Sequence, residues 1–345
     1  MSTDSNSSVL ASETIQVADS YELSMSKTDV DLFAPIDAPF PFRNPHADVV
    51  LKSSDNVWFR VRKAILSEAS PVFEDMFNLP PEQTTTSDSS TLPVVPLAED
   101  STIIEGLLRL CYPADTAPVD PSTIDQAVAW LVAARKYDMK RAERFITRVM
   151  HQMIPGAPLH AYCLAVRHRL SENFARAAAK HFLDEPLRTE YPSIDRELKH
   201  ISAFAYMNLC NFHHNCSVAA QRAVAQYLPA DSELEKRCWK TCLGFTGGHR
   251  CPRYSVASCT VDGAEYVVIG WFSKLMDHCK MLVKDRPSGN QLAYHDTIKE
   301  SLTDAYACDH CKQHAWDDIQ AFLALVRAQI DHAMAEVSCP SFRAS

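Results

Sequence analysis

The first third of the chain alternates short β-rich runs with turn residues before longer apolar stripes begin. Residues 48–52 and 57–61 carry the β-rich runs, and the polar Ser-Ser-Asp-Asn cluster between them predicts a hairpin. Residues 92–97 form a third strand candidate, which its two prolines confine to the edge of a sheet. Ser70 followed by Pro71 is typical of a helix N-terminus, so a short helix is expected to follow.

Three longer helices come next, and each is marked by one apolar stripe. Apolar residues recur at helical spacing within residues 103–111, 124–132 and 139–149. Pro121 is expected to begin the second of these helices, and Asp138 to cap the third. Because the strands come first and the helices afterwards, rather than in alternation, the order predicts an α+β fold.

The second half of the chain is expected to be mostly helical. Ser171 can cap one helix, residues 194–228 indicate a long helical stretch, and residues 319–330 carry an amphipathic pattern. Asp262-Gly263, placed between two β-rich runs, predicts one further hairpin. No repeat with a period of about 20–50 residues is visible, so a solenoid is not expected.

Composition narrows the possible functions. The 345 residues include 34 basic and 43 acidic side chains, so the net charge of −9 lacks the cationic surplus that nonspecific nucleic-acid binding requires. The Lys and Arg side chains of residues 136–148 match an ordinary solvated helix face. No run approaches the roughly 18–20 apolar residues of a membrane span, and no export signal is visible. We therefore expect an intracellular protein, in the cytoplasm or the nucleus, with neither membrane nor nucleic acid as its partner.

The N-terminal segment has two parts. Residues 1–35 are rich in Ser, Asp and Thr and keep no apolar period, so a disordered tail is expected. Residues 36–45 are spaced by prolines, which favour an extended lead-in. This lead-in either docks Phe40 and Phe42 onto the following domain or is a plain linker.

The ungapped stretch from Phe59 to Phe77 resembles the signature of the BTB/POZ family. That signature reads F-x-A-H-[KR]-x-V-L-x-x-x-S-x-x-F-x-x-M-F, and this chain reads FRVRKAILSEASPVFEDMF. The chain departs from it in two ways, because Arg62 stands where most members have His and the polar loop 82–91 is longer than usual. The resemblance implies a BTB/POZ domain, with a short sheet and a helical cluster, over residues 46–155. Its core positions are Phe59, Leu66, Phe73, Met76 and Phe77.

The resemblance implies a non-catalytic protein–protein interaction module, a scaffold or adaptor with protein partners. A helical extension over residues 156–230 and a cysteine-containing, mostly helical region over residues 231–340 complete the expected organisation. The proline-spaced lead-in and the cysteine-bearing tail look most like the BTB/POZ proteins of basidiomycete fungi. A substrate adaptor of a cullin-3 ubiquitin ligase is an alternative, with residues 79–82 one position out of the register of the family's hydrophobic-x-Glu element.

Dimerising members of the family place an Asp and a basic residue near their two-fold axis. Asp48 and Lys63 occupy the matching positions here, so the resemblance implies a possible homodimer. A solvated Asp and a solvated Lys are the alternative interpretation. The interface assigned on this basis comprises Asp48, Arg62, Lys63, Phe40 and Phe42.

Seven of the twelve cysteines lie in the stretch from Cys238 to Cys311. Cys308-x2-Cys311 has the spacing of a zinc knuckle, and Cys238-x3-Cys242 can complete a site of four thiolates. Such a closed site would hold a structural zinc ion; the alternative is a set of buried free thiols. A cysteine-dependent enzyme is the alternative from another class, although the chain carries none of the family nucleophile signatures.

Overall fold

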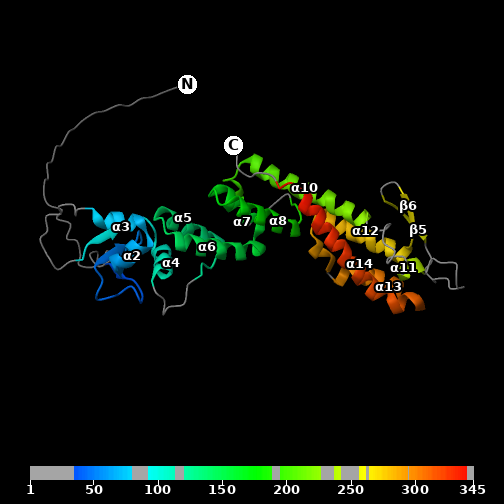
Figure 1. Ribbon diagram of the computed structural model, residues 1–345, viewed down its shortest axis with the longest axis horizontal. Helices are drawn as coiled ribbons and strands as arrows, with labels where there is room; N and C mark the ends of the chain where they lie inside the picture. The colour runs from blue at the N-terminus through cyan, green and yellow to red at the C-terminus, as the bar shows by residue number, and fades with distance from the viewer. Residues whose placement is uncertain are drawn as a thin grey trace, which may run out of the picture. The chain divides into compact units, whose positions relative to one another are not determined.

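The structure is a computed structural model in which helices dominate (Figure 1). It describes residues 35–79, 92–112, 120–188, 195–226, 237–241, 256–261, 264–293 and 295–339. The chain divides into two compact units, one comprising residues up to 64 with 80–104, the other residues 65–79 with everything from 105 onward. Helices α2 (Lys63–Ala69) and α4 (Ser101–Cys111) both run from the first unit into the second. The predicted disordered tail lies outside the described residues, except for Pro35.

The first unit is built on a sheet with the strand order β1-β3-β2-β4. Its antiparallel centre is the predicted hairpin, in which Leu51 pairs with Phe59. The short strands β1 and β4 add parallel partners at the two edges, so the edge position predicted for the proline-bearing strand is confirmed. The strands are β1 (Ile36–Asp37), β2 (Val49–Lys52), β3 (Val57–Val61) and β4 (Val94–Pro96).

The hairpin turn also contacts the first residue of helix α4. The Asp55 carboxylate accepts hydrogen bonds from the Ser101 backbone N–H, at 2.8 Å, and from the Ser101 hydroxyl, at 2.6 Å. Although partial burial opposes the charge, hydrogen bonds from Ser101 and Ser53 lower the pKa of Asp55. Asp100 caps α4 by accepting the Ile103 N–H at 3.0 Å, and Asp55, 46 residues before Ser101, supplies a second acceptor at the start of the same helix.

The second unit contains the remaining helices and one hairpin, which confirms the mostly helical second half and the α+β class. The antiparallel strands β5 (Val256–Val261) and β6 (Ala264–Ile269) form the predicted hairpin, whose Asp262-Gly263 turn lies outside the described residues. The predicted limits of the extension and of the cysteine-containing region stay predictions. The helices are α3 (Pro71–Asn78), α5 (Ile124–Lys136), α6 (Lys140–Met153), α7 (Pro158–Arg167), α8 (Glu172–His181), α9 (Asp195–Leu198), α10 (Ala203–Gln226), α11 (Cys238–Thr241), α12 (Gly270–Asp285), α13 (His295–Ala305) and α14 (Asp309–Glu336).

Two predicted helix starts were wrong. Helix α5 begins after Thr123, whose hydroxyl accepts the Gln126 N–H, and not at Pro121. Asp138 does not cap α6, because its φ of 50° places it in the left-handed region one residue before the N-cap, Met139. The Asp138 carboxylate instead pairs with Lys140 Nζ at 2.7 Å. An acidic side chain near a helix start therefore acts here as an ion-pair partner.

The core of the C-terminal helices is aromatic. The Trp239 ring stacks on Phe272 with centroids 4.2 Å apart, and the Phe322 ring meets Phe272 edge-on at 4.9 Å. These three side chains come from α11, α12 and α14, and helix α10 packs beside both α12 and α14 (Figure 1). Buried aromatic side chains of this size contribute more apolar contact area than any other residue type.

A buried carboxylate joins the start of α11 to α14. Asp318 Oδ1 lies 2.9 Å from Arg237 Nη1, and Asp318 Oδ2 accepts the backbone N–H of Cys238 at 2.8 Å. Because both carboxylate oxygens have a donor, burying this charge is compensated. Asp318 thus fixes the short helix that carries Trp239.

Acidification is expected to destabilise the fold through His213. This side chain is 2% exposed, and its Nε2 lies 3.0 Å from the Glu185 carbonyl oxygen, so Nε2 carries the proton that it donates. Burial lowers the pKa of His213 below its usual value of 6.5. As the pH falls below 6.5, His213 is therefore protonated in the unfolded chain before it is protonated in the folded chain. The free energy of unfolding falls as a result.

Urea unfolding between pH 7.5 and 5 measures this dependence. We expect His213→Gln, which keeps a donor for Glu185, to show a shallower loss of stability than the parent protein. His332→Gln is the matched control, because the His332 side chain is 74% exposed. An unchanged pH slope in His213→Gln would contradict the assignment.

Candidate protein-interaction site

The lead-in docks one of its two phenylalanines. Phe42 is fully buried, and its ring packs against Phe59 with centroids 5.8 Å apart. Phe40 is 77% exposed, so burial supports docking for Phe42, and the docking of Phe40 stays a prediction. The side chain of Arg43 holds the segment by donating to the Ala38 carbonyl at 2.6 Å. Of the two lead-in phenylalanines, Phe42 therefore belongs to the core and Phe40 lies mostly at the surface.

Asp48 and Lys63, the predicted interface pair, lie in contact. The contact runs through the backbone, because the Lys63 N–H donates to Asp48 Oδ1 at 2.7 Å. Asp48 thereby caps the first residue of α2, which explains an Asp at this position without a partner chain. Arg62 is exposed and Lys63 is half-buried. Their role in an interface stays a prediction.

The signature residue Ser70 joins α3 to the turn between α5 and α6. Its hydroxyl oxygen accepts the Phe73 N–H at 3.1 Å and donates its proton to the Tyr137 carbonyl. The Phe73 ring stacks on Tyr137 at 4.8 Å and on Phe77 at 5.9 Å. Leu66 and Phe73 are buried, whereas Met76 and Phe77 are half-buried.

A groove of about 300 Å³ lies between α5, α6 and the start of α8. This volume is at the lower end of the range found for ligand pockets, about 300–1,000 Å³. Buried apolar side chains form its floor, and polar and charged side chains form its rim. The floor consists of Leu131, Met150, Leu170 and Phe174, and the rim of Arg135, Glu143, Arg144, Thr147 and Ser171.

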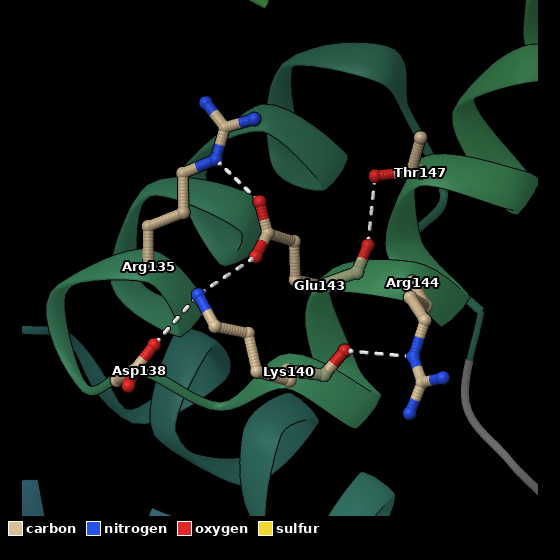
Figure 2. Close-up of polar contacts among 6 residues, drawn as sticks. All are labelled: Arg135, Asp138, Lys140, Glu143, Arg144 and Thr147. Atoms are coloured by element: carbon tan, nitrogen blue, oxygen red, sulfur yellow. Dashed lines mark hydrogen bonds and ion pairs between the residues drawn. The ribbon is translucent and has the colours of Figure 1, made fainter. Parts of the chain in front are cut away.

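Glu143 organises the charges along the rim, as Figure 2 shows. Glu143 Oε1 lies 2.9 Å from Arg135 Nε, and Glu143 Oε2 lies 3.8 Å from Lys140 Nζ. The hydrogen bond from Lys140 to Asp138, together with the charge of Asp138, raises the pKa of Lys140. Near the α5–α6 turn, the charges of Arg135 and Glu143 on the rim and of the neighbouring Lys140 are therefore all paired.

Arg144 is placed differently from Arg135. Its Nε donates to the Lys140 carbonyl oxygen of the same helix at 3.3 Å (Figure 2). Within the part of the chain that the structure describes, no hydrogen bond engages its two Nη groups. The N-terminus of α8, capped by Ser171, adds its positive dipole end to the same groove. The groove thus combines an apolar floor with donors for an anionic group.

The predicted zinc ligands are only partly described. Cys308 is the N-cap of α14 and Cys311 lies in its first turn, so this pair stands at the start of a helix. No group of three His, Cys, Asp or Glu side chains among the described residues is placed to hold a metal ion. Cys242 lies outside the described residues, so the four-thiolate site stays a prediction.

Buried thiols in this structure are poor nucleophiles. Burial raises the pKa of four of them to about 12, whereas a reactive cysteine needs a lowered pKa to form its thiolate. These thiols therefore stay protonated at neutral pH, unlike the nucleophile that a cysteine-dependent enzyme requires. They are the buried Cys163, Cys216 and Cys279 and the half-buried Cys111.

The groove was not predicted from the sequence. Arg144 was assigned to a solvated helix face, Phe174 was placed only on the helix that Ser171 caps, and Leu170 was given no role. One signal was present, because the Ser171 cap predicts where α8 begins and therefore where its dipole starts. The approach of α8 to α5 and α6 depends on tertiary packing, which apolar periodicity does not encode.

Comparison with known proteins supports a domain at this site. Residues 41–154 match the BTB/POZ domain family, and the comparison with curated proteins gives no match. A BTB/POZ domain is a protein-interaction module. Helices α5 and α6 lie inside the matched residues, whereas Leu170, Ser171 and Phe174 lie beyond them. In the described part of the chain, every helix is too short or too polar to cross a membrane.

Removing the Phe73 ring tests the packing that supports this site. We expect Phe73→Ala to lower the free energy of unfolding by about 3–5 kcal/mol, since a buried aromatic side chain is lost. Met76→Ala, at a half-buried position of the same helix, is the control and should cost less. Denaturant unfolding measures both values. A loss for Phe73→Ala of under about 1 kcal/mol would contradict the packing described here.

Proposed function

We propose that this chain is a non-catalytic adaptor that binds a short segment of a partner protein in the groove between α5, α6 and α8. The observation that carries the proposal is the composition of the groove, an apolar floor beside arginine donors. Residues 41–154 of the chain match a family of protein-interaction domains, which supports a protein as the ligand. The groove is shared between the matched domain and the helices after it, so the two regions act together in binding.

The chemistry of the groove indicates what the bound segment carries. The floor of Leu131, Met150 and Phe174 accepts one bulky apolar side chain. The Nη groups of Arg144 and the N-terminus of α8 favour a carboxylate close to that side chain. We therefore expect a segment in which Leu or an aromatic residue stands next to Asp or Glu.

Reversing the charge of Arg144 tests this function. Fluorescence anisotropy with labelled peptides that carry one Leu or Phe flanked by acidic residues measures the affinity. Arg144→Glu should weaken binding by about tenfold or more, because attraction at the rim becomes repulsion. Arg148→Glu is the matched control, since it makes the same charge change on an exposed residue of the same helix.

The same experiment can overturn the proposal. If the acidic peptides bind no better than peptides with Lys in place of Asp and Glu, the charge argument is wrong. If Arg148→Glu weakens binding as much as Arg144→Glu, the effect comes from overall charge and not from the groove. Raising the salt concentration should weaken binding by the parent protein, because the rim is exposed to solvent.

A cullin-3 ligase adaptor is the narrower form of this proposal. Leu79 follows helix α3 and is 68% exposed, which leaves its side chain accessible to a partner. The remaining residues of the predicted element, 80–82, lie outside the described residues. The adaptor role is supported if the parent protein co-purifies with cullin-3 and Leu79→Asp abolishes this binding. It is contradicted if the parent protein does not co-purify with cullin-3 at micromolar concentrations.

Homodimerisation is a second proposal, and the exposure of the lead-in favours it. Ile36 is 60% exposed and Phe40 is 77% exposed, so two large apolar side chains lie on one short segment. If this segment forms a dimer interface, Phe40→Asp should convert the dimer to a monomer in light scattering. Val132→Asp, at a 47% exposed apolar position elsewhere, is the control. A parent protein that is monomeric across micromolar concentrations would contradict the dimer.

A further inference from the structure

Two histidines lie one helical turn apart near the start of α14. His310 and His314 are at positions i and i+4, and their ring centroids are 5.4 Å apart with an interplanar angle of 59°. His310 is half-buried and His314 is exposed, so solvent ions reach the pair. Residues at this spacing are neighbours on one helix face. The pair lies far outside the residues that match the BTB/POZ domain family.

The separation of the rings matches the dimensions of a metal complex. Metal–nitrogen bonds to histidine are about 2.0–2.1 Å long, which puts each ring centroid about 3.2 Å from the metal. Two such rings at a tetrahedral angle have centroids about 5.2 Å apart, and at a right angle about 4.5 Å. The observed 5.4 Å is close to the tetrahedral value.

We infer that His310 and His314 together bind one divalent transition-metal ion. Imidazole is a ligand suited to zinc, copper and nickel, and two imidazoles on adjacent turns form a chelate. Asp317 lies one turn further along the same face and is exposed, so its charge attracts a cation to the pair. The site holds two protein ligands, and water or a donor from another molecule fills the remaining positions.

This site differs from the four-thiolate site that the sequence predicts. Cys311 is fully buried and belongs to the apolar core of the C-terminal helices, whereas His314 lies on the solvent side of the same helix. The cysteines and the histidines of this segment therefore face different surroundings. An ion bound by the histidines would link the first two turns of α14. Metal binding would therefore stabilise the N-terminal part of this helix, which also carries Asp318.

Nickel is the probe of choice, because zinc would also bind to cysteine thiolates. The full-length protein, freed of metal with a chelator, is titrated with Ni²⁺ alone and followed by calorimetry. In each of the variants His310→Ala and His314→Ala, one Ni²⁺ ion should no longer bind, or its affinity should fall at least tenfold, because chelation by the second imidazole is lost. His332→Ala is the matched control, as it removes an exposed histidine of the same helix with a glutamate and no histidine at i+4.

A second measurement places the ion. Trp316 is 44% exposed and follows His314 by two residues, so a paramagnetic ion at the pair should quench its fluorescence. Trp316→Phe should abolish the quenching and leave the heat of binding unchanged. If His310→Ala and His314→Ala bind Ni²⁺ as the parent protein does, or if quenching persists in Trp316→Phe, the inference is wrong. Circular dichroism checks that the variants keep their helices.

Discussion

The Ser70 hydroxyl accepts one hydrogen bond and donates another, and the turn between α5 and α6 depends on both. By accepting the Phe73 N–H it starts α3, and by donating to the Tyr137 carbonyl it holds the end of α5. The stacked rings of Phe73 and Tyr137 make the same connection through apolar contact. Because α6 begins three residues after Tyr137, the position of Glu143 between Arg135 and Lys140 follows from this turn.

The groove is formed by helices inside the residues that match the BTB/POZ family together with a helix after them. The matched residues end at position 154, and the floor of the groove is completed by Leu170 and Phe174. The matched residues thus supply both arginines of the rim and half of the floor, Leu131 and Met150, and the residues after them supply the other half. A domain cut at its family boundary would keep the charges of the rim and lose part of the floor.

Much of the fold could be predicted because it follows local rules. The β-rich runs beside turn residues identified the two hairpins, and helical apolar periods identified most helices. Ser70 and Ser171 marked true helix starts. Asp138 was predicted wrongly because an acidic residue near a helix start has two uses, and the left-handed backbone there excludes the cap. Phe40 and Phe42 have similar neighbours in the sequence, yet tertiary packing buries one and exposes the other. The groove and the His310–His314 pair required knowledge of which surfaces meet and which remain open.

The bond between Asp318 and the start of α11 spans 80 residues of sequence. During synthesis, Trp239 and Phe272 leave the ribosome well before Phe322, the ring that meets both of them edge-on. Until α14 is made, these large apolar rings lack their covering helix and the Cys238 N–H lacks its acceptor. Nascent chains of this protein therefore pass through a stage in which apolar surface of the kind that chaperones bind is exposed. A chain terminated before residue 318 would remain in this exposed state.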